Sequence, residues 1–277
     1  LFSLAKIAME GKDAYREGLA ALEEKHLSLV EGLLPLEDRA EGSGYVRQRI
    51  QELEDLYHGI YLIKEQSPRT LDYVASFGER LSTFILSKAL AFRGIPTHFL
   101  DAREIIRTDD RFGHARVDEA ETSALIQAYF AKQPGVKVVT GFIAATAKGE
   151  TTTLGRSGSD YTAALLAAAL QAESLEIWTD VSGVLTCDPK MVYAAFTIPQ
   201  LSYAEAMELS HFGAKVIFPA TMQPAMKKNI PIQIKNTFEP QHPGTLIQGT
   251  VRQGGWIKGI SSRSNLSLLT LQSSECF

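Results

Sequence analysis

Residues 151–172 read TTTLGRSGSDYTAALLAAALQA, a polar turn with two glycines followed directly by an alanine-rich run that is typical of a helix. Free backbone N–H groups at the start of a helix, at the positive end of its dipole, form a site for an anion. Arg156 adds a planar guanidinium suited to a carboxylate or phosphate, and Asp160 is able to hold magnesium or orient an ammonium group. The alternative is structural, with Ser159 capping the helix and Asp160 complementing its dipole. The sequence leaves both interpretations open.

Around this turn, from residue 70 onward, short runs rich in β-branched residues alternate with helical runs. Such alternation predicts an α/β fold, a mostly parallel sheet with helices on both faces. The expected strands are Ile95–Leu100, Val136–Ile143, Leu175–Thr179 and Ile230–Lys235. The expected helices are Glu79–Phe92, Glu119–Ala131, Tyr161–Ala172, Tyr203–His211 and Ala220–Lys228.

The part of the chain before residue 70 shows helical spacing of apolar residues. Residues Leu1–Met9 predict a short helix, and Tyr15–Leu33 and Val46–Ile60 each carry apolar residues at steps of three and four. We therefore expect a hairpin of two antiparallel helices over about residues 13–65, joined by a polar connector at 37–44.

The composition excludes several classes of protein. With 45% hydrophobic and 22% charged residues among 277, the chain is an ordinary globular sequence, and its net charge of −4 argues against a nucleic-acid binder. Two cysteines are too few for a disulfide framework or a zinc site. No run approaches the ~18 apolar residues of a membrane span, and the start lacks the pattern of a secretory signal. We expect a cytoplasmic protein with no nucleic-acid or membrane partner.

Common catalytic signatures are absent. The sequence has no Walker A motif, no HExxH and no CxxC, and Ser159 stands where a nucleophile elbow requires its last glycine. Ordinary hydrolase and P-loop interpretations are therefore disfavoured.

A second polar segment is SFGERLS at residues 76–82. Ser76 and Glu79 have the spacing of a capping box, in which Glu79 only satisfies a backbone donor. Alternatively, Glu79 is a carboxylate presented at a strand-to-helix turn, where a cationic amine docks.

A third segment is WTDVSGVLTCDPK at residues 178–190. Thr179 and Asp180 lie at the end of an expected strand, where ligand groups gather in open α/β sheets. Asp180 suits ribose hydroxyls and Lys190 suits a phosphate. Ser-Gly and Asp-Pro are equally good turn signals, so a purely structural role stays open.

Together, five segments in this order resemble the aspartate kinase family, whose catalytic domain has the amino-acid-kinase fold. The matching segments are Ser76–Ser82, Leu154–Asp160, Glu176–Pro189, Ser210–Pro219 and Ile234–Leu246. Glu176–Asp180 and Ile234–Leu246 look most like the bifunctional aspartate kinase–homoserine dehydrogenases.

The resemblance implies a domain organisation. Residues 1–247 would form the kinase domain, and 248–277 a linker and the beginning of an ACT-like α+β regulatory region, with residues 256–272 as its first strands. The family's Lys-Phe-Gly-Gly-Thr-Ser motif is absent, so we expect a chain that lacks the first strand and phosphate loop and is impaired on its own. Dimerisation, or a higher homo-oligomer through the ACT region, is also implied.

The resemblance also assigns residue roles. Glu79 would bind the α-amino group of the substrate, and Arg156 would clamp a substrate carboxylate with help from Ser159. Asp160 would organise the reacting groups and the metal, which makes Asp160 and Arg156 the expected catalytic residues. The nucleotide would be contacted by Thr179, Asp180, Leu185, Lys190 and Lys215. No residue is expected to be a dedicated metal ligand.

The implied reaction transfers the γ-phosphoryl group of ATP, with Mg²⁺, to the β-carboxylate of L-aspartate. The product is 4-phospho-L-aspartate, the first intermediate of lysine, threonine and methionine biosynthesis. A carboxylate nucleophile is already ionised at neutral pH, so positioning and charge neutralisation carry the catalysis.

Two further departures from the family pattern concern single residues. Ser157 replaces a usual glycine or asparagine, and Leu185 replaces a frequent tyrosine that would stack on the base. The alternatives are a sister kinase acting on glutamate or acetylglutamate, and a non-catalytic amino-acid-sensing module of the same fold.

Overall fold

The structure, a computed structural model, describes residues 1–212, 218–251, 257–260 and 267. The chain divides into two compact units, Leu1–Ala172 and Glu173–Phe277. The predicted division into a kinase domain over 1–247 and an ACT-like region over 248–277 stays a prediction, since most of the second range lies outside the described residues.

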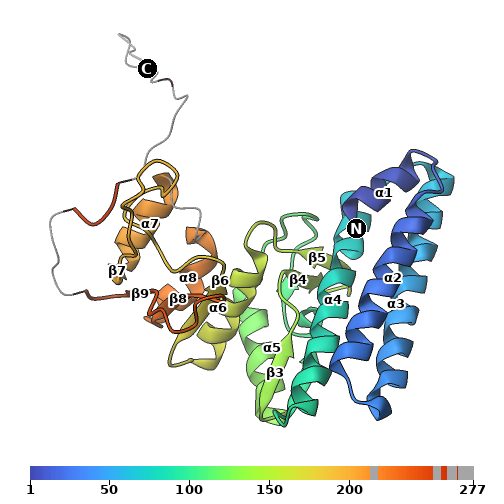
Figure 1. Cartoon of the computed structure of the whole chain (residues 1–277), viewed down its shortest axis with the longest axis horizontal. Helices are drawn as coiled ribbons and strands as arrows, with labels where there is room; N and C mark the ends of the chain where they lie inside the picture. Colours follow the sequence, from blue (N-terminus) through green and yellow to red (C-terminus); the bar gives the residue numbers. More distant parts are fainter. Residues whose placement is uncertain (213–217, 252–256, 261–266, 268–277) are drawn as a thin grey trace. The chain divides into compact units, whose positions relative to one another are not determined.

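The first unit opens with four helices (Figure 1). They are α1 (Phe2–Met9), α2 (Tyr15–Leu33), α3 (Leu36–Ile63) and α4 (Pro68–Phe92). The connector expected at 37–44 is wrong, because α3 begins at Leu36. Pro35 sets the extended backbone before the helix, and Glu37 and Asp38 favour its first turn through the helix dipole.

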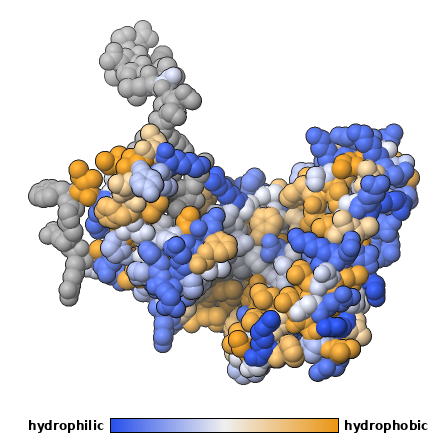
Figure 2. Space-filling model, in the orientation of Figure 1, coloured by the Kyte–Doolittle hydropathy of each residue, from blue (hydrophilic) through white to orange (hydrophobic). Residues whose placement is uncertain are grey.

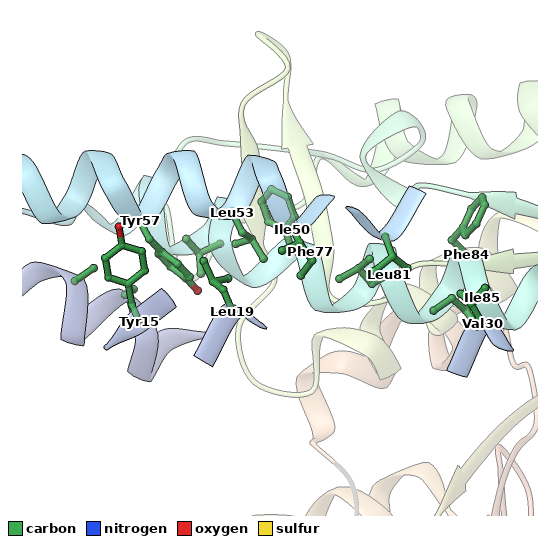
Figure 3. Close-up of a cluster of buried hydrophobic side chains, with 14 of the residues drawn as sticks. Tyr15, Leu19, Val30, Ile50, Leu53, Tyr57, Phe77, Leu81, Phe84 and Ile85 are labelled. Carbon is green, nitrogen blue, oxygen red and sulfur yellow. The ribbon is translucent and has the colours of Figure 1, made fainter. Parts of the chain in front are cut away.

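A cluster of buried side chains holds these four helices together (Figure 3). Its members recur at helical steps, which places them on the facing sides of the helices. They include Tyr15, Leu19, Val30, Ile50, Leu53, Tyr57, Phe77, Leu81, Phe84 and Ile85. The Tyr57 hydroxyl donates to the carbonyl of Leu1 (2.9 Å), and burial raises the pKa of this phenol. The cluster fixes α4, the helix that carries Glu79.

Helix α4 begins earlier than predicted, and this overturns both the capping box and the strand-to-helix turn expected at residues 76–82. Ser67 caps the helix by accepting from the backbone N–H of Thr70 (3.1 Å). Ser76 lies inside the helix, and its hydroxyl donates to the carbonyl of Tyr73 (2.7 Å). Glu79 is therefore neither part of a capping box nor at a strand-to-helix turn, but projects from the middle of a long helix.

Two small sheets complete the first unit with helices α5 (Glu119–Lys132) and α6 (Gly158–Leu170). Strand β1 (Thr97–Leu100) pairs in parallel with β3 (Val136–Val139). Strand β2 (Arg107–Thr108) pairs in parallel with β4 (Ile143–Thr146), which pairs antiparallel with β5 (Thr151–Thr153). A short 3-10 helix, Ala102–Glu104, follows β1.

The strand predicted over Val136–Ile143 is two strands, β3 and β4. Phe142 has a positive φ of 68°, which extended backbone does not allow, and Ile143 N–H donates to the carbonyl of Gly141 (2.7 Å) in a tight turn. The hydroxyl of Thr140 accepts from the N–H of Ala102 (2.8 Å) and fixes the end of β3.

The described residues of the second unit form a four-stranded sheet in the order β6-β8-β9-β7 with two helices. Its elements are β6 (Leu175–Thr179), β7 (Gln200–Ser202), α7 (Tyr203–Phe212), α8 (Pro219–Lys227), β8 (Ile232–Asn236) and β9 (Thr245–Gln248). Ile232, Ile234 and Ile247 are fully buried on one side of the sheet. The Tyr203 hydroxyl ties α7 to the carbonyl of Ile230 (2.7 Å).

Among the named strands of the described residues, four of six pairings are parallel, which confirms the predicted α/β fold with mostly parallel strands flanked by helices. Hydrophilic residues are spread over the face shown in Figure 2, including the region of α2 and α3. Within the described part of the chain, no helix is both long and apolar enough to cross a bilayer.

Candidate active site

The residues expected to form the site fall into both units. Glu79, Arg156, Ser159 and Asp160 belong to the first unit, and Thr179, Asp180, Leu185 and Lys190 to the second. Lys215 lies outside the described residues. The geometry of the amino-acid side of the site is therefore a property of the first unit.

The turn between β5 and α6 carries three of these residues. Ser157 occupies the N-cap position with a left-handed φ of 56°, and no side chain caps the helix. Ser159 is the second residue of α6 and is exposed, so the interpretation of Ser159 as the cap is wrong. A helix start without a side-chain cap keeps donors available for an anion.

Two close approaches shape this turn. Gly155 has a φ of 72°, and a Cβ there would lie 2.6 Å from Nδ1 of His114. At Gly141, a Cβ would lie 2.9 Å from Cβ of Ser159. Only glycine fits at either position without displacing its neighbour, and at Gly141 this lets the first turn of α6 approach the β3–β4 connection closely.

The β3–β4 connection is a part of the site that sequence reasoning missed. Phe142 N–H donates to the hydroxyl of Thr162 (3.1 Å), and the Phe142 carbonyl accepts from Leu154 N–H (2.9 Å). These bonds fix Phe142 between the turn and the first part of α6. The glycine at position 141, inside the strand expected over Val136–Ile143, was the signal available in the sequence.

The side chains of Glu79 and Asp160 have similar surroundings. Both carboxylates are half-buried, and within the described residues neither has a hydrogen-bond or ion-pair partner. Burial raises the pKa of Glu79 and the pKa of Asp160, because removal from water disfavours the charged form. Half-buried carboxylates of this kind are suited to bind a cationic ligand, or a metal ion that also binds a phosphate.

The raised pKa of Glu79 leads to a prediction about the stability of the protein. A carboxyl group whose pKa is raised by folding stabilises the protein at low pH, and that contribution is lost as the pH rises through its folded pKa. Glu79→Gln removes the ionisation, so we expect the free energy of unfolding at pH 7 to rise by about 0.5–1 kcal/mol. The gain should shrink as the pH is lowered.

Urea unfolding at several pH values measures this effect. Glu17→Gln, at an exposed position in the first turn of α2, is the matched control. A Glu79→Gln protein that is less stable than wild type at pH 7 would contradict the burial argument.

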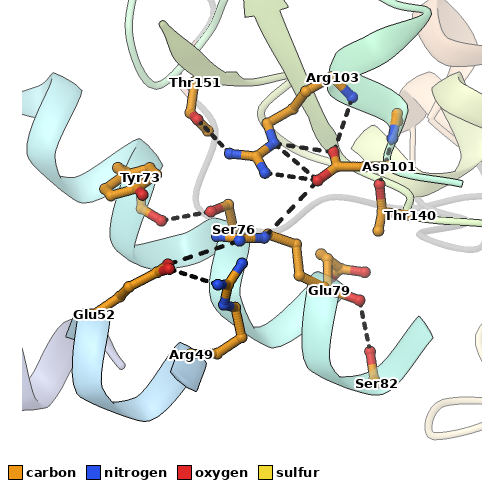
Figure 4. A network of polar contacts seen from close by, with 12 residues as sticks. Arg49, Glu52, Tyr73, Ser76, Glu79, Ser82, Asp101, Arg103, Thr140 and Thr151 are labelled. Atoms are coloured by element: carbon orange, nitrogen blue, oxygen red, sulfur yellow. Dashed lines mark hydrogen bonds and ion pairs between the residues drawn. The ribbon is translucent and has the colours of Figure 1, made fainter. Parts of the chain in front are cut away.

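A polar network joins α4 to the strands beside the site (Figure 4). The buried guanidinium of Arg80 lies 3.8 Å from a carboxylate oxygen of Glu52 and 3.8 Å from one of Asp101. Asp101 in turn pairs with Arg103 (2.6 Å), and Arg103 Nη1 donates to the hydroxyl of Thr151 (2.9 Å). The chain of contacts runs from α3 through α4 to β5, and so limits movement of Glu79 relative to the strand that leads to Arg156.

In the second unit, the predicted nucleotide residues lie at and after the end of β6. Thr179 is the last residue of the strand, and its hydroxyl donates to the carboxylate of Asp180 (3.1 Å). Leu185 pairs with Thr197 in an isolated bridge. Lys190 is exposed, and its N–H donates to the Asp188 carboxylate (2.9 Å), as the Asp-Pro turn signal predicts.

The described residues form an α/β protein in which helix α6 starts without a side-chain cap. The model of the amino acid kinase family matches residues 17–236, and the chain belongs to that family. The predicted resemblance to aspartate kinases is confirmed by two relatives. Lysine-sensitive aspartokinase 3 of Escherichia coli is 40% identical over 230 residues, which cover 80% of this chain and 51% of that protein. Bifunctional aspartokinase/homoserine dehydrogenase 2 of Zea mays, a chloroplastic protein, is 35% identical over 279 residues, which cover 98% of this chain and 30% of that protein.

A solved structure agrees with these relatives. Escherichia coli aspartokinase III in complex with aspartate and ADP superposes with a TM-score of 0.83 at 36% identity, covering 93% of this chain and 57% of that one. The chain spans about half the length of the Escherichia coli relative and less than a third of the maize relative.

Proposed function

We propose that the protein is an aspartate kinase that transfers the γ-phosphoryl group of ATP to the β-carboxylate of L-aspartate. The observation that carries the proposal is two half-buried carboxylates, Glu79 and Asp160, that have no partner among the described residues. They belong to the unit that also presents Arg156 and an α6 start without a side-chain cap. An amino acid with one ammonium and two carboxylate groups complements this set of charges. The similarity to aspartokinases supports this assignment.

In this proposal each residue of the first unit has a defined task. Glu79 accepts hydrogen bonds from the substrate ammonium group, and Arg156 holds a substrate carboxylate with its planar fork. Ser159, exposed in the first turn of α6, donates a hydroxyl to the same carboxylate. The substrate β-carboxylate is ionised at neutral pH, so no general base is required.

Asp160 fits the requirement for Mg²⁺ in phosphoryl transfer. Among the described residues, no group of three or more His, Cys, Asp or Glu side chains is placed to hold a metal. Mg²⁺ is ordinarily bound by one or two carboxylates together with substrate phosphates and water. A single carboxylate, such as that of Asp160, is therefore enough. The ion would neutralise charge on the phosphates.

The nucleotide side of the proposal rests on the second unit. Thr179, Asp180, Leu185 and Lys190 would line the ATP site, together with Lys215. Three further parts of the assignment stay predictions: a linked homoserine dehydrogenase, a homodimer or higher homo-oligomer, and a cytoplasmic location.

An acyl-phosphate assay tests the function. The full-length gene product is incubated with ATP, Mg²⁺ and L-aspartate, and hydroxylamine traps the product as a hydroxamate. We expect product only when ATP and L-aspartate are both present, with little from glutamate or acetylglutamate.

Two other outcomes would contradict the proposal. Faster turnover of glutamate or acetylglutamate would indicate a sister kinase. Tight aspartate binding without any hydroxamate would indicate an amino-acid-sensing module.

A further inference from the structure

Asp72 is a buried carboxylate on α4 with three hydrogen-bond donors around it. It is 4% exposed. Its Oδ2 accepts from the N–H of Thr153 (3.0 Å) and the N–H of Gly113 (2.8 Å), and its Oδ1 accepts from the Thr153 hydroxyl (2.7 Å). Hydrogen bonds to an ionised acceptor are roughly twice as strong as those between neutral groups.

These bonds join three separate segments at one point. Thr153 ends β5, three residues before Arg156, and its carbonyl accepts from Ala115 N–H (3.0 Å). The loop that contains Gly113 continues into His114, whose ring lies against Gly155. One carboxylate therefore fixes both the strand that enters the β5–α6 turn and the loop that packs on the turn.

The same carboxylate also sets the position of Glu79. Asp72 and Glu79 are seven residues apart on α4, which is two helical turns, so they lie on the same face of the helix. Any tilt or rotation of α4 relative to β5 would stretch the bonds of Asp72 and would change the position of Glu79 relative to the β5–α6 turn.

We propose that Asp72 is a positioning residue for the amino-acid substrate, because it holds the Glu79 helix at a fixed separation from the Arg156 turn. This inference rests on the proposed function. Asp72 acts through the two binding residues and does not contact substrate itself. Its effect should therefore appear in the aspartate requirement and not in the ATP requirement.

Asp72→Asn is the sharpest test, because it keeps the shape but presents an amide group to donors that need an acceptor. We expect the KM for aspartate to rise about tenfold, with the KM for ATP and kcat changed less than about twofold. Thr153→Val removes only the hydroxyl donor and should raise the aspartate KM by about two- to threefold. It also keeps the inference testable if Asp72→Asn does not fold.

The matched control is Thr152→Val on the same strand. Thr152 is also buried, and its hydroxyl hydrogen-bonds to that of Thr108 (2.7 Å) instead of Asp72. We expect it to lower the melting temperature without changing the aspartate KM.

An unchanged aspartate KM in Asp72→Asn, equal changes in both KM values, or the same rise in Thr152→Val would each overturn the inference while leaving the kinase assignment intact. A wild-type protein that forms no acyl phosphate would overturn the assignment, and the inference with it.

Discussion

Replacement of Arg156 by alanine is expected to raise the aspartate concentration needed for half-maximal rate by about 100-fold, the loss expected for one bidentate charged contact. The ATP requirement should change less than about threefold. Arg156 is exposed in the turn between β5 and α6, so the substitution removes a surface side chain without opening a cavity in the core. Steady-state kinetics with each substrate varied in turn measures both values.

Two variants sharpen this experiment. Arg156→Lys keeps the charge but loses the planar fork, and we expect an intermediate effect. Arg93→Ala, at the exposed C-terminal end of α4, is the control and should leave both requirements unchanged. Equal increases in the aspartate and ATP requirements would count against the assignment of Arg156 to the amino-acid site.

Replacement of Asp160 by asparagine is expected to lower kcat by about a thousandfold, the scale of losing a group that organises the transferring phosphate. The substitution preserves size and removes the charge. Because burial raises the pKa of Asp160, the ionised carboxylate opposes folding at neutral pH, and the variant should be more stable than wild type at pH 7. The gain should fade as the pH is lowered.

A control with the opposite expected result, lower stability and unchanged kcat, is available at the start of another helix. Asp118 caps α5 by accepting from the N–H of Glu121 (2.9 Å). Asp118→Ala should cost about 1 kcal/mol of stability and leave kcat unchanged. An Asp160→Asn protein that loses stability at pH 7 and retains its kcat would show that Asp160 only supports the helix.

The elements that were predicted correctly have local signals. Strand β6 has the predicted bounds, Leu175–Thr179. Helix α7 starts with a capping box at Ser202 and Glu205, which have the three-residue spacing of that motif: Ser202 N–H donates to the carboxylate of Glu205 (2.7 Å), and Glu205 N–H donates to the Ser202 hydroxyl (3.2 Å). Both signals involve neighbours in sequence, so they can be read without the fold.

The same spacing failed at Ser76 and Glu79, because tertiary packing decides where α4 begins. Phe77 and Leu81 are buried in the helical core, and this burial favours a continuous helix from Pro68 over a new start at residue 76. The connector predicted at 37–44 failed for the same reason: the packed core stabilises a helix through a weak local sequence.

In the candidate site, too, features with a local sequence signal could be predicted, and features that depend on tertiary contacts could not. The turn from Leu154 to Asp160 could be proposed as part of the site from its sequence, because its polar groups are contiguous. Asp72 was missed, since it lies 81 positions before Thr153 and no spacing rule connects the two. Phe142 was missed because its left-handed backbone depends on bonds to Thr162 and Leu154.

We propose that Glu79 and Arg156 recognise opposite charges of one amino acid. A crystal structure of the protein with L-aspartate bound tests this directly. We expect a substrate carboxylate within about 3 Å of the Arg156 guanidinium and the ammonium group within about 3 Å of the Glu79 carboxylate. Aspartate bound elsewhere, with these two side chains directed into solvent, would contradict the account.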